Sequence, residues 1–147
     1  MVNADRLVKR FMEMVEISSV SGQEGAFRDY LQKHFTALGL SWEEDEAGRT
    51  LNGGSGNLLV RAAGTKEARP ILLMAHMDTV VPGQGIKAVL GEDRIIRSDG
   101  TTILGADDKA GVAAILEAYD VLLEKGLDYP PLELLFTVSE EQGLLGA

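Results

Sequence analysis

The sequence contains no cysteine, has fewer basic than acidic residues, and has no long apolar run. Without cysteine it has neither disulfides nor thiolate metal sites, which favours a reducing compartment such as the cytosol. Its 14 basic and 23 acidic residues give a net charge of −9. This charge argues against nucleic acid or an anionic membrane as partner, because both require a basic face. No segment approaches the roughly 20 apolar residues of a membrane span, and the N-terminus lacks the apolar centre of a signal peptide. We therefore expect a cytoplasmic protein.

Helical and extended patterns alternate along the 147 residues, of which 45% are hydrophobic. Helical spacing of apolar residues predicts a helix over 3–17, a second that ends at Gly39, and a third from about 108 to 125. Ser21 and Glu24 have the spacing of a capping box for the second helix. Extended apolar runs predict strands over 40–46, 57–62, 70–76 and 132–138, a hairpin over 87–97 and a loop over 48–56. We expect an α/β domain with a mainly parallel sheet flanked by helices.

Three pairs of metal-binding side chains follow apolar runs of this pattern. The pairs are His76 with Asp78, Asp107 with Asp108, and Glu140 with Glu141. The carboxyl ends of parallel strands share one edge of a sheet, and ligands bind at that edge. Imidazole nitrogen and carboxylate oxygen are ligands of Zn²⁺. The three pairs together therefore predict a divalent metal site.

Each pair also has a simpler interpretation. His76 could cap a strand end while Asp78 begins a turn, although the two side chains share one face and Asp78 could instead orient a metal-binding imidazole. Asp107 or Asp108 could be a helix N-cap. Two adjacent carboxylates on a tight loop nevertheless repel each other unless a cation compensates them. Lys109 would do so in part and a divalent metal more fully.

The last pair, Glu140 and Glu141, could be solvated residues at a helix start. In a metal site they would divide the work: one glutamate would bind the metal, and the other would take a proton from the attacking water and return it to the leaving group.

These residues also carry a resemblance to a known family. The chain resembles the co-catalytic zinc exopeptidases of the peptidase T, glutamate carboxypeptidase and aminoacylase group. The resemblance is carried by segments 76–83, 104–111 and 136–141, together with the opening segment 18–24. Segments 98–102 and 107–111 resemble the peptidase T branch most. The resemblance covers essentially the whole chain. It implies a zinc-exopeptidase-like catalytic domain.

The resemblance also implies a role for each residue. His76 would bind one zinc ion, Glu141 would bind the second, and Asp107 would bridge the two. Glu140 would be the general base, and Asp78 would orient His76. Cobalt or manganese could replace zinc. Family members also often have a cis peptide bond after the bridging aspartate, which here is Asp107.

Family enzymes have a further aspartate ligand, a histidine ligand near the C-terminus and a lid domain, all downstream of segment 76–141. We therefore expect residues 1–147 to be the N-terminal part of a metallopeptidase catalytic domain, without the lid and dimerisation domain. The expected activity is an aminopeptidase acting on short peptides such as tripeptides. An N-acyl amino-acid deacylase or a carboxypeptidase of the same family is the alternative. A noncatalytic fragment and a pure metal-binding domain are further alternatives. We also expect a homo-oligomer.

Overall fold

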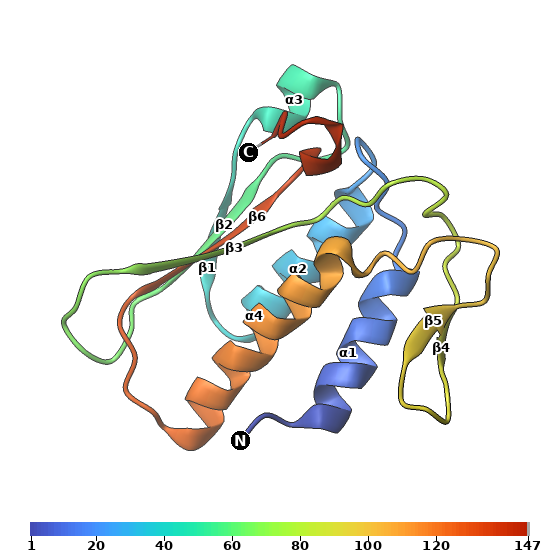
Figure 1. Ribbon diagram of the computed structural model, residues 1–147. Helices are drawn as coiled ribbons and strands as arrows, with labels where there is room; N and C mark the ends of the chain where they lie inside the picture. Colours follow the sequence, from blue (N-terminus) through green and yellow to red (C-terminus); the bar gives the residue numbers. More distant parts are fainter. Residues whose placement is uncertain (147) are drawn as a thin grey trace.

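A sheet of four strands, covered on one face by helices, forms the body of the protein. The computed structural model describes residues 1–146, and Figure 1 shows α1, α2 and α4 on the same side of the sheet. The strands follow the order β1-β2-β6-β3. Their bounds are β1 (Ser41–Glu44), β2 (Leu58–Ala62), β3 (Ile71–His76) and β6 (Leu132–Thr137).

The helices that cover the sheet are α1 (Ala4–Glu16), α2 (Gly25–Ala37) and α4 (Ala106–Lys125), so the three predicted helices are confirmed. The Asn3 side chain accepts a hydrogen bond from the backbone N–H of Arg6 and begins α1. Gly126, at φ 57°, ends α4. The core lies between helices and sheet, and its largest buried apolar side chains are Phe27, Phe35, Phe136, Met14, Leu31, Leu58, Met77, Leu116 and Leu134.

The predicted α/β class is confirmed, and the sheet itself is mixed. Strands β3 and β6 run parallel, whereas the β1–β2 and β2–β6 pairs are antiparallel. The connection from β3 to β6 contains α4, and a helical crossover of this kind returns the chain in the same direction. The connection from β1 to β2, residues 45–57, reverses the chain instead. Within the sheet, parallel pairing is confined to β3, which ends in His76, and β6, which shortly precedes Glu140 and Glu141.

The smaller elements partly follow the sequence predictions. The predicted hairpin is present as β4 (Ala88–Leu90) and β5 (Ile96–Ser98), which lie beside α1. The segment predicted as a loop contains a short helix, α3 (Ala47–Leu51). A 3₁₀-helix, η1 (Glu140–Gln142), follows β6. Among residues 1–146, no helix has both the length and the apolar character needed to cross a membrane.

The predicted capping box at the start of α2 is wrong. The N-cap residue of α2 is Glu24, and its side chain makes no capping hydrogen bond. Both side chains of the supposed box bind elsewhere: the Ser21 hydroxyl donates to Asp78, and the Glu24 carboxylate accepts from Ser139. Long-range partners thus take the place of the box, and Glu24 keeps one local bond, from the Gly22 N–H.

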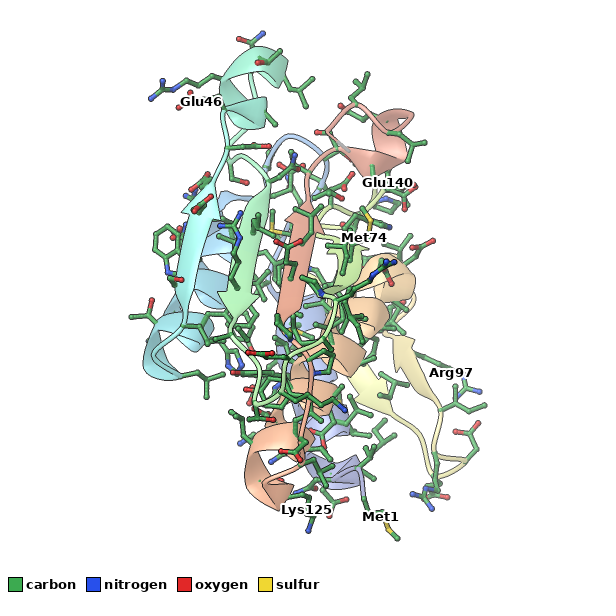
Figure 2. The ribbon with its side chains drawn as sticks, turned by 90° about the vertical axis from the view of Figure 1, so that its left-hand side faces the viewer. Met1, Glu46, Met74, Arg97, Lys125 and Glu140 are labelled. Atoms are coloured by element: carbon green, nitrogen blue, oxygen red, sulfur yellow. The ribbon has the colours of Figure 1, made fainter. Side chains whose placement is uncertain are left out.

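The opposite face of the sheet is turned toward the viewer in Figure 2, with the helices behind it. Met74, labelled there, is 51% exposed. On the same edge strand, Leu72 points to the same face as Met74 and is 52% exposed. This face is therefore apolar near β3.

A partly buried ion pair ties α1 to α4. The Arg6 guanidinium donates from Nε to Glu117 Oε2 over 2.7 Å, and the Glu117 side chain is 2% exposed. Arg6 also contacts Glu124, whose side chain is 49% exposed. Hydrogen bonding from Arg6 outweighs burial and lowers the pKa of Glu117.

We expect Glu117→Ala to lower the free energy of unfolding by about 2 kcal/mol at neutral pH, because it removes charge-assisted hydrogen bonds. The lowered pKa means that this stabilisation is present above the ordinary carboxyl pKa of 4.5 and is lost as pH falls through the value in the folded protein. Urea titrations should thus show the variant and wild type converging in acid. Glu124→Ala is the control, since it touches the same arginine in solvent. An equal loss in both variants would contradict this account.

Candidate metal centre

The predicted metal ligands come together where β3 and β6 end. His76 is the last residue of β3 and pairs with Thr137 of β6. Glu140 and Glu141 lie in η1, which is separated from the end of β6 by Val138 and Ser139. Because β3 and β6 are parallel, both strands present their carboxyl ends at this edge. Figure 2 shows Glu140 at the same end of the sheet as Met74 of β3.

The imidazole of His76 is at the centre of the cluster and is 9% exposed. Its Nδ1 lies 2.9 Å from the backbone oxygen of Asp78. A carbonyl oxygen can only accept, so Nδ1 carries a proton and Nε2 faces the acidic side chains. Nε2 lies 3.0 Å from Asp107 Oδ1 and 3.8 Å from Glu140 Oε2.

The pKa values in the cluster reveal a surplus of negative charge. Burial disfavours the charged form of His76, yet contacts with Asp78 and Asp107 outweigh it and raise the pKa of the imidazole to about 9. The pKa of Glu141 is raised by burial and then by the charge of Asp107. Without another cation, His76 thus holds a proton and Glu141 is pushed toward its neutral form.

His76, Glu140 and Glu141 offer donor atoms that all lie within 4.8 Å of one another. Asp107 joins this group through its contact with His76. One imidazole nitrogen and several carboxylate oxygens are ligands that suit Zn²⁺ and similar divalent ions. A divalent ion would also supply the positive charge that the carboxylates lack. The residues present therefore fit a metal centre, although the close group includes Glu140, which the family resemblance assigns to proton transfer.

Asp78 lies beneath the cluster and is fully buried. Its carboxylate accepts hydrogen bonds from the backbone N–H of Glu140 at 2.9 Å, from that of Glu141 at 3.1 Å, and from the Ser21 hydroxyl at 2.6 Å. Burial opposes ionisation, but these bonds and the contact with His76 lower the pKa of Asp78. The predicted contact with His76 is present in a modified form, since the ring nitrogen is closer to the backbone oxygen than to the carboxylate, at 3.4 Å.

The two adjacent aspartates have different surroundings. Asp108 Oδ1 accepts a hydrogen bond from the backbone N–H of Gly111 at 3.0 Å, as an N-cap does. The Asp107 side chain is 83% exposed and reaches His76. The Asp107–Asp108 peptide bond is cis, as the resemblance implies. The N-cap interpretation thus applies to Asp108 and leaves Asp107 available as a ligand.

Lys109 does not compensate this pair of aspartates, contrary to the sequence-based suggestion. It is fully buried; its ammonium group donates to the backbone oxygen of Ile17 at 2.5 Å and lies 4.7 Å from the centre of the Phe27 ring. Burial lowers the pKa of Lys109 to about 7. Since this cation points into the core, the cluster keeps its surplus negative charge.

The fold and the donor set together define an α/β protein with a candidate divalent metal centre at the strand ends. The family model of Peptidase family M28 matches residues 57–147, and the chain belongs to this family. The predicted resemblance to exopeptidases of the peptidase T group is confirmed.

Solved structures of two peptidases resemble this chain over nearly its whole length. A tripeptidase from Staphylococcus aureus is 44% identical with a TM-score of 0.96, and the match covers 99% of this chain and 39% of that one. Aminopeptidase PepT from Bacillus cereus is 45% identical with a TM-score of 0.94 and the same coverage. The Bacillus subtilis protein YqjE is 45% identical over 147 residues, which are 100% of this chain and 39% of that protein. The chain thus spans about two-fifths of the length of these relatives.

The different surroundings of the two aspartates lead to a matched pair of variants. Asp107→Ala should weaken Zn²⁺ binding at least about tenfold, as ligand and near-ligand losses do, with little change in stability because its side chain is exposed. Asp108→Ala should lower the free energy of unfolding by about 1 kcal/mol, as the loss of a cap does, with a smaller effect on zinc. Calorimetric titration and urea unfolding of both variants measure the two effects. The opposite pattern would reverse the two roles.

Proposed function

We propose that this chain carries the metal-binding part of a metal-dependent peptidase that releases the amino-terminal residue from short peptides such as tripeptides. The observation that carries the proposal is the group of donor atoms from His76, Glu140 and Glu141 at the strand ends. The names of the two similar solved structures, a tripeptidase and an aminopeptidase, support the choice of substrate. Membership of Peptidase family M28 supports the reaction.

In this proposal His76 would hold one zinc ion, Glu141 would hold a second, and Asp107 would be shared between them; cobalt or manganese could replace zinc. The bound ions would polarise the scissile carbonyl and lower the pKa of water. Asp78 holds His76 through the ring nitrogen Nδ1 and so leaves Nε2 free to bind metal. The exposed Asp107 side chain suits the shared role, because it lies 3.0 Å from His76 Nε2 and its charge helps to raise the pKa of Glu141.

Glu140 moves the proton in this scheme. Its carboxylate takes a proton from the attacking water, and it then gives that proton to the nitrogen of the leaving amine. The Glu140 side chain is 34% exposed, so it can contact a substrate that approaches from solvent. Its backbone N–H is held by Asp78, which fixes the point from which the carboxylate extends.

A hollow of about 330 Å³ adjoins Glu141 and offers a place for the peptide. It is lined in part by Val20, Thr79, Val80 and Val81, with Ser21 and Gln23 at its polar side. Val81 is 76% exposed. An apolar wall next to the metal ligands suits the side chain of a peptide residue.

We further propose that residues 1–147 are part of a catalytic domain completed by ligands and a lid outside this sequence. The 39% share of the relatives that the chain covers supports this view. A homo-oligomer is consistent with the apolar face of β3, since exposed strand edges and apolar patches favour self-association. A cytoplasmic location remains a prediction from the absence of cysteine.

Two glutamate variants test the proposed division of labour. They are made in the longer protein of which residues 1–147 are proposed to be a part. Glu140→Gln should remove most tripeptide hydrolysis yet retain zinc, because it loses only the base. Glu141→Gln should lose zinc as well, because it loses a ligand. Metal content by atomic absorption and turnover on the same samples decide this, with an N-acetylated tripeptide as a control for deacylase activity. Equal zinc loss in both variants would make Glu140 a ligand.

The 147-residue chain on its own should bind zinc weakly and hydrolyse tripeptides at no appreciable rate. With Asp107 shared, residues 1–147 would supply two ligands to each ion, whereas catalytic zinc normally has three protein ligands. Without a lid, the substrate is also neither positioned nor shielded from water. Zinc calorimetry and a tripeptide assay with added metal measure both properties. Turnover of roughly 1 per second or more would refute the proposal that further ligands are needed.

A further inference from the structure

The turn that carries both glutamates is held by an unusual set of hydrogen bonds. Three successive backbone N–H groups, those of Ser139, Glu140 and Glu141, each donate to a buried carboxylate. The Ser139 N–H donates to Glu24 Oε1 over 3.1 Å, and the next two donate to Asp78. Ser139 has φ 52°, in the left-handed region, a conformation that costs free energy for a residue other than glycine. The turn therefore depends on partners that hold it in place.

The Glu24 carboxylate is wholly enclosed at this point. Its side chain is 0% exposed, and Oε1 also accepts from the Gly22 N–H at 2.9 Å and lies 3.4 Å from the Ser139 hydroxyl. The second oxygen, Oε2, is buried and has no hydrogen-bond partner among residues 1–146. Within the same residues no arginine, lysine or histidine forms an ion pair with Glu24. Burying a carboxylate in this way is unfavourable, so its presence needs a compensating role.

The segment that carries Glu24 is itself anchored next to His76. Two hydrogen bonds join this segment to the residues that follow β3. The Ser19 hydroxyl donates to the backbone oxygen of Met77 at 2.8 Å, and the Thr79 N–H donates to the backbone oxygen of Ser19 at 3.0 Å. The Ser21 hydroxyl donates to Asp78. Segment 18–24 thus joins the chain beside His76 to the chain before Glu140, and both carboxylates that hold the turn are tied to it.

We propose that Glu24 is a positioning residue that acts through Ser139. As a hydrogen-bond acceptor it fixes the left-handed turn after β6, and this turn sets where the Glu140 and Glu141 side chains point relative to His76. Ser21 supports the same turn through Asp78. The expected effect of Glu24 on metal binding rests on the proposed function. The hydrogen bond by which Glu24 holds the turn is a property of the metal-free chain and can be measured without metal.

Three variants of the 147-residue chain separate the acceptor role from a general loss of stability. Glu24→Gln keeps an oxygen that can accept from Ser139, and Glu24→Ala removes it. Glu117→Ala is the control, because it removes another buried glutamate that contacts α1 and not the turn. Amide hydrogen exchange is followed by NMR without metal, with the Leu134 amide of the buried strand β6 as internal reference.

Glu24→Ala should reduce the protection of the Ser139, Glu140 and Glu141 amides about tenfold relative to Leu134, the effect of losing one hydrogen bond. Glu24→Gln should keep their protection close to that of the wild type, and Glu117→Ala should change the turn and Leu134 alike. A loss in Glu24→Ala that is no larger at the turn than at Leu134 would overturn the proposal. So would a loss in Glu24→Gln equal to that in Glu24→Ala.

Cobalt(II) titration of the same samples, read by visible absorption, tests the consequence for the site. Glu24→Ala should bind at least about tenfold more weakly than wild type with an altered spectrum, and Glu24→Gln should resemble wild type. If the wild type binds cobalt and Glu24→Ala binds it equally well with the same spectrum, the positioning role is wrong. If the wild type binds no cobalt while the exchange results hold, the metal function fails for this chain and the hold of Glu24 on the turn stands.

Discussion

The parallel pairing of β3 with β6 is the constraint on which the rest of the site depends. It sets His76 opposite Thr137, and the backbone N–H of Met77 continues the ladder by donating to Thr137 at 2.8 Å. A slip of one residue would turn His76 to the other face of the sheet, away from the glutamates. The helix α4, as the crossover between these two strands, brings Asp107 to the same edge. Sheet register thus decides whether an imidazole and several carboxylates meet at all.

Charge is the second organising factor of this edge. Asp78, Asp107, Glu140 and Glu141 surround one imidazole, while the nearby Lys109 points into the core. Hydrogen bonds from backbone N–H groups satisfy Asp78, whereas Asp107 extends into solvent and Glu141 is only partly buried. The chain therefore stabilises one carboxylate internally and leaves the others in need of an external positive charge. This pattern supports the proposed metal centre, because an ordinary acidic surface keeps its carboxylates in solvent.

The sequence predicts those features that arise from local patterns. The apolar stripe with Phe27, Leu31 and Phe35 defines α2, and extended runs that end in His76 or precede Glu140 place the candidate ligands at strand ends. Local patterns did not predict the mixed sheet or α3, and they predicted a capping box that is absent. Strand direction and the partners of Ser21 and Glu24 depend instead on distant segments. Lys109 shows the same limit: its position in the sequence suggests a partner for the aspartates, but packing against Phe27 and Ile17 decides where its charge lies.

The strand order has a consequence for how the protein is made. The last strand in the sequence, β6, occupies the middle of the sheet, between β2 and β3. While the chain leaves the ribosome, β2 and β3 therefore have no shared neighbour until residues 132–137 emerge and insert between them. The nascent chain keeps two open apolar strand edges during this time, a state prone to association with other chains. The insertion of β6 therefore completes the sheet and, in the same step, brings the segment with Glu140 and Glu141 beside His76.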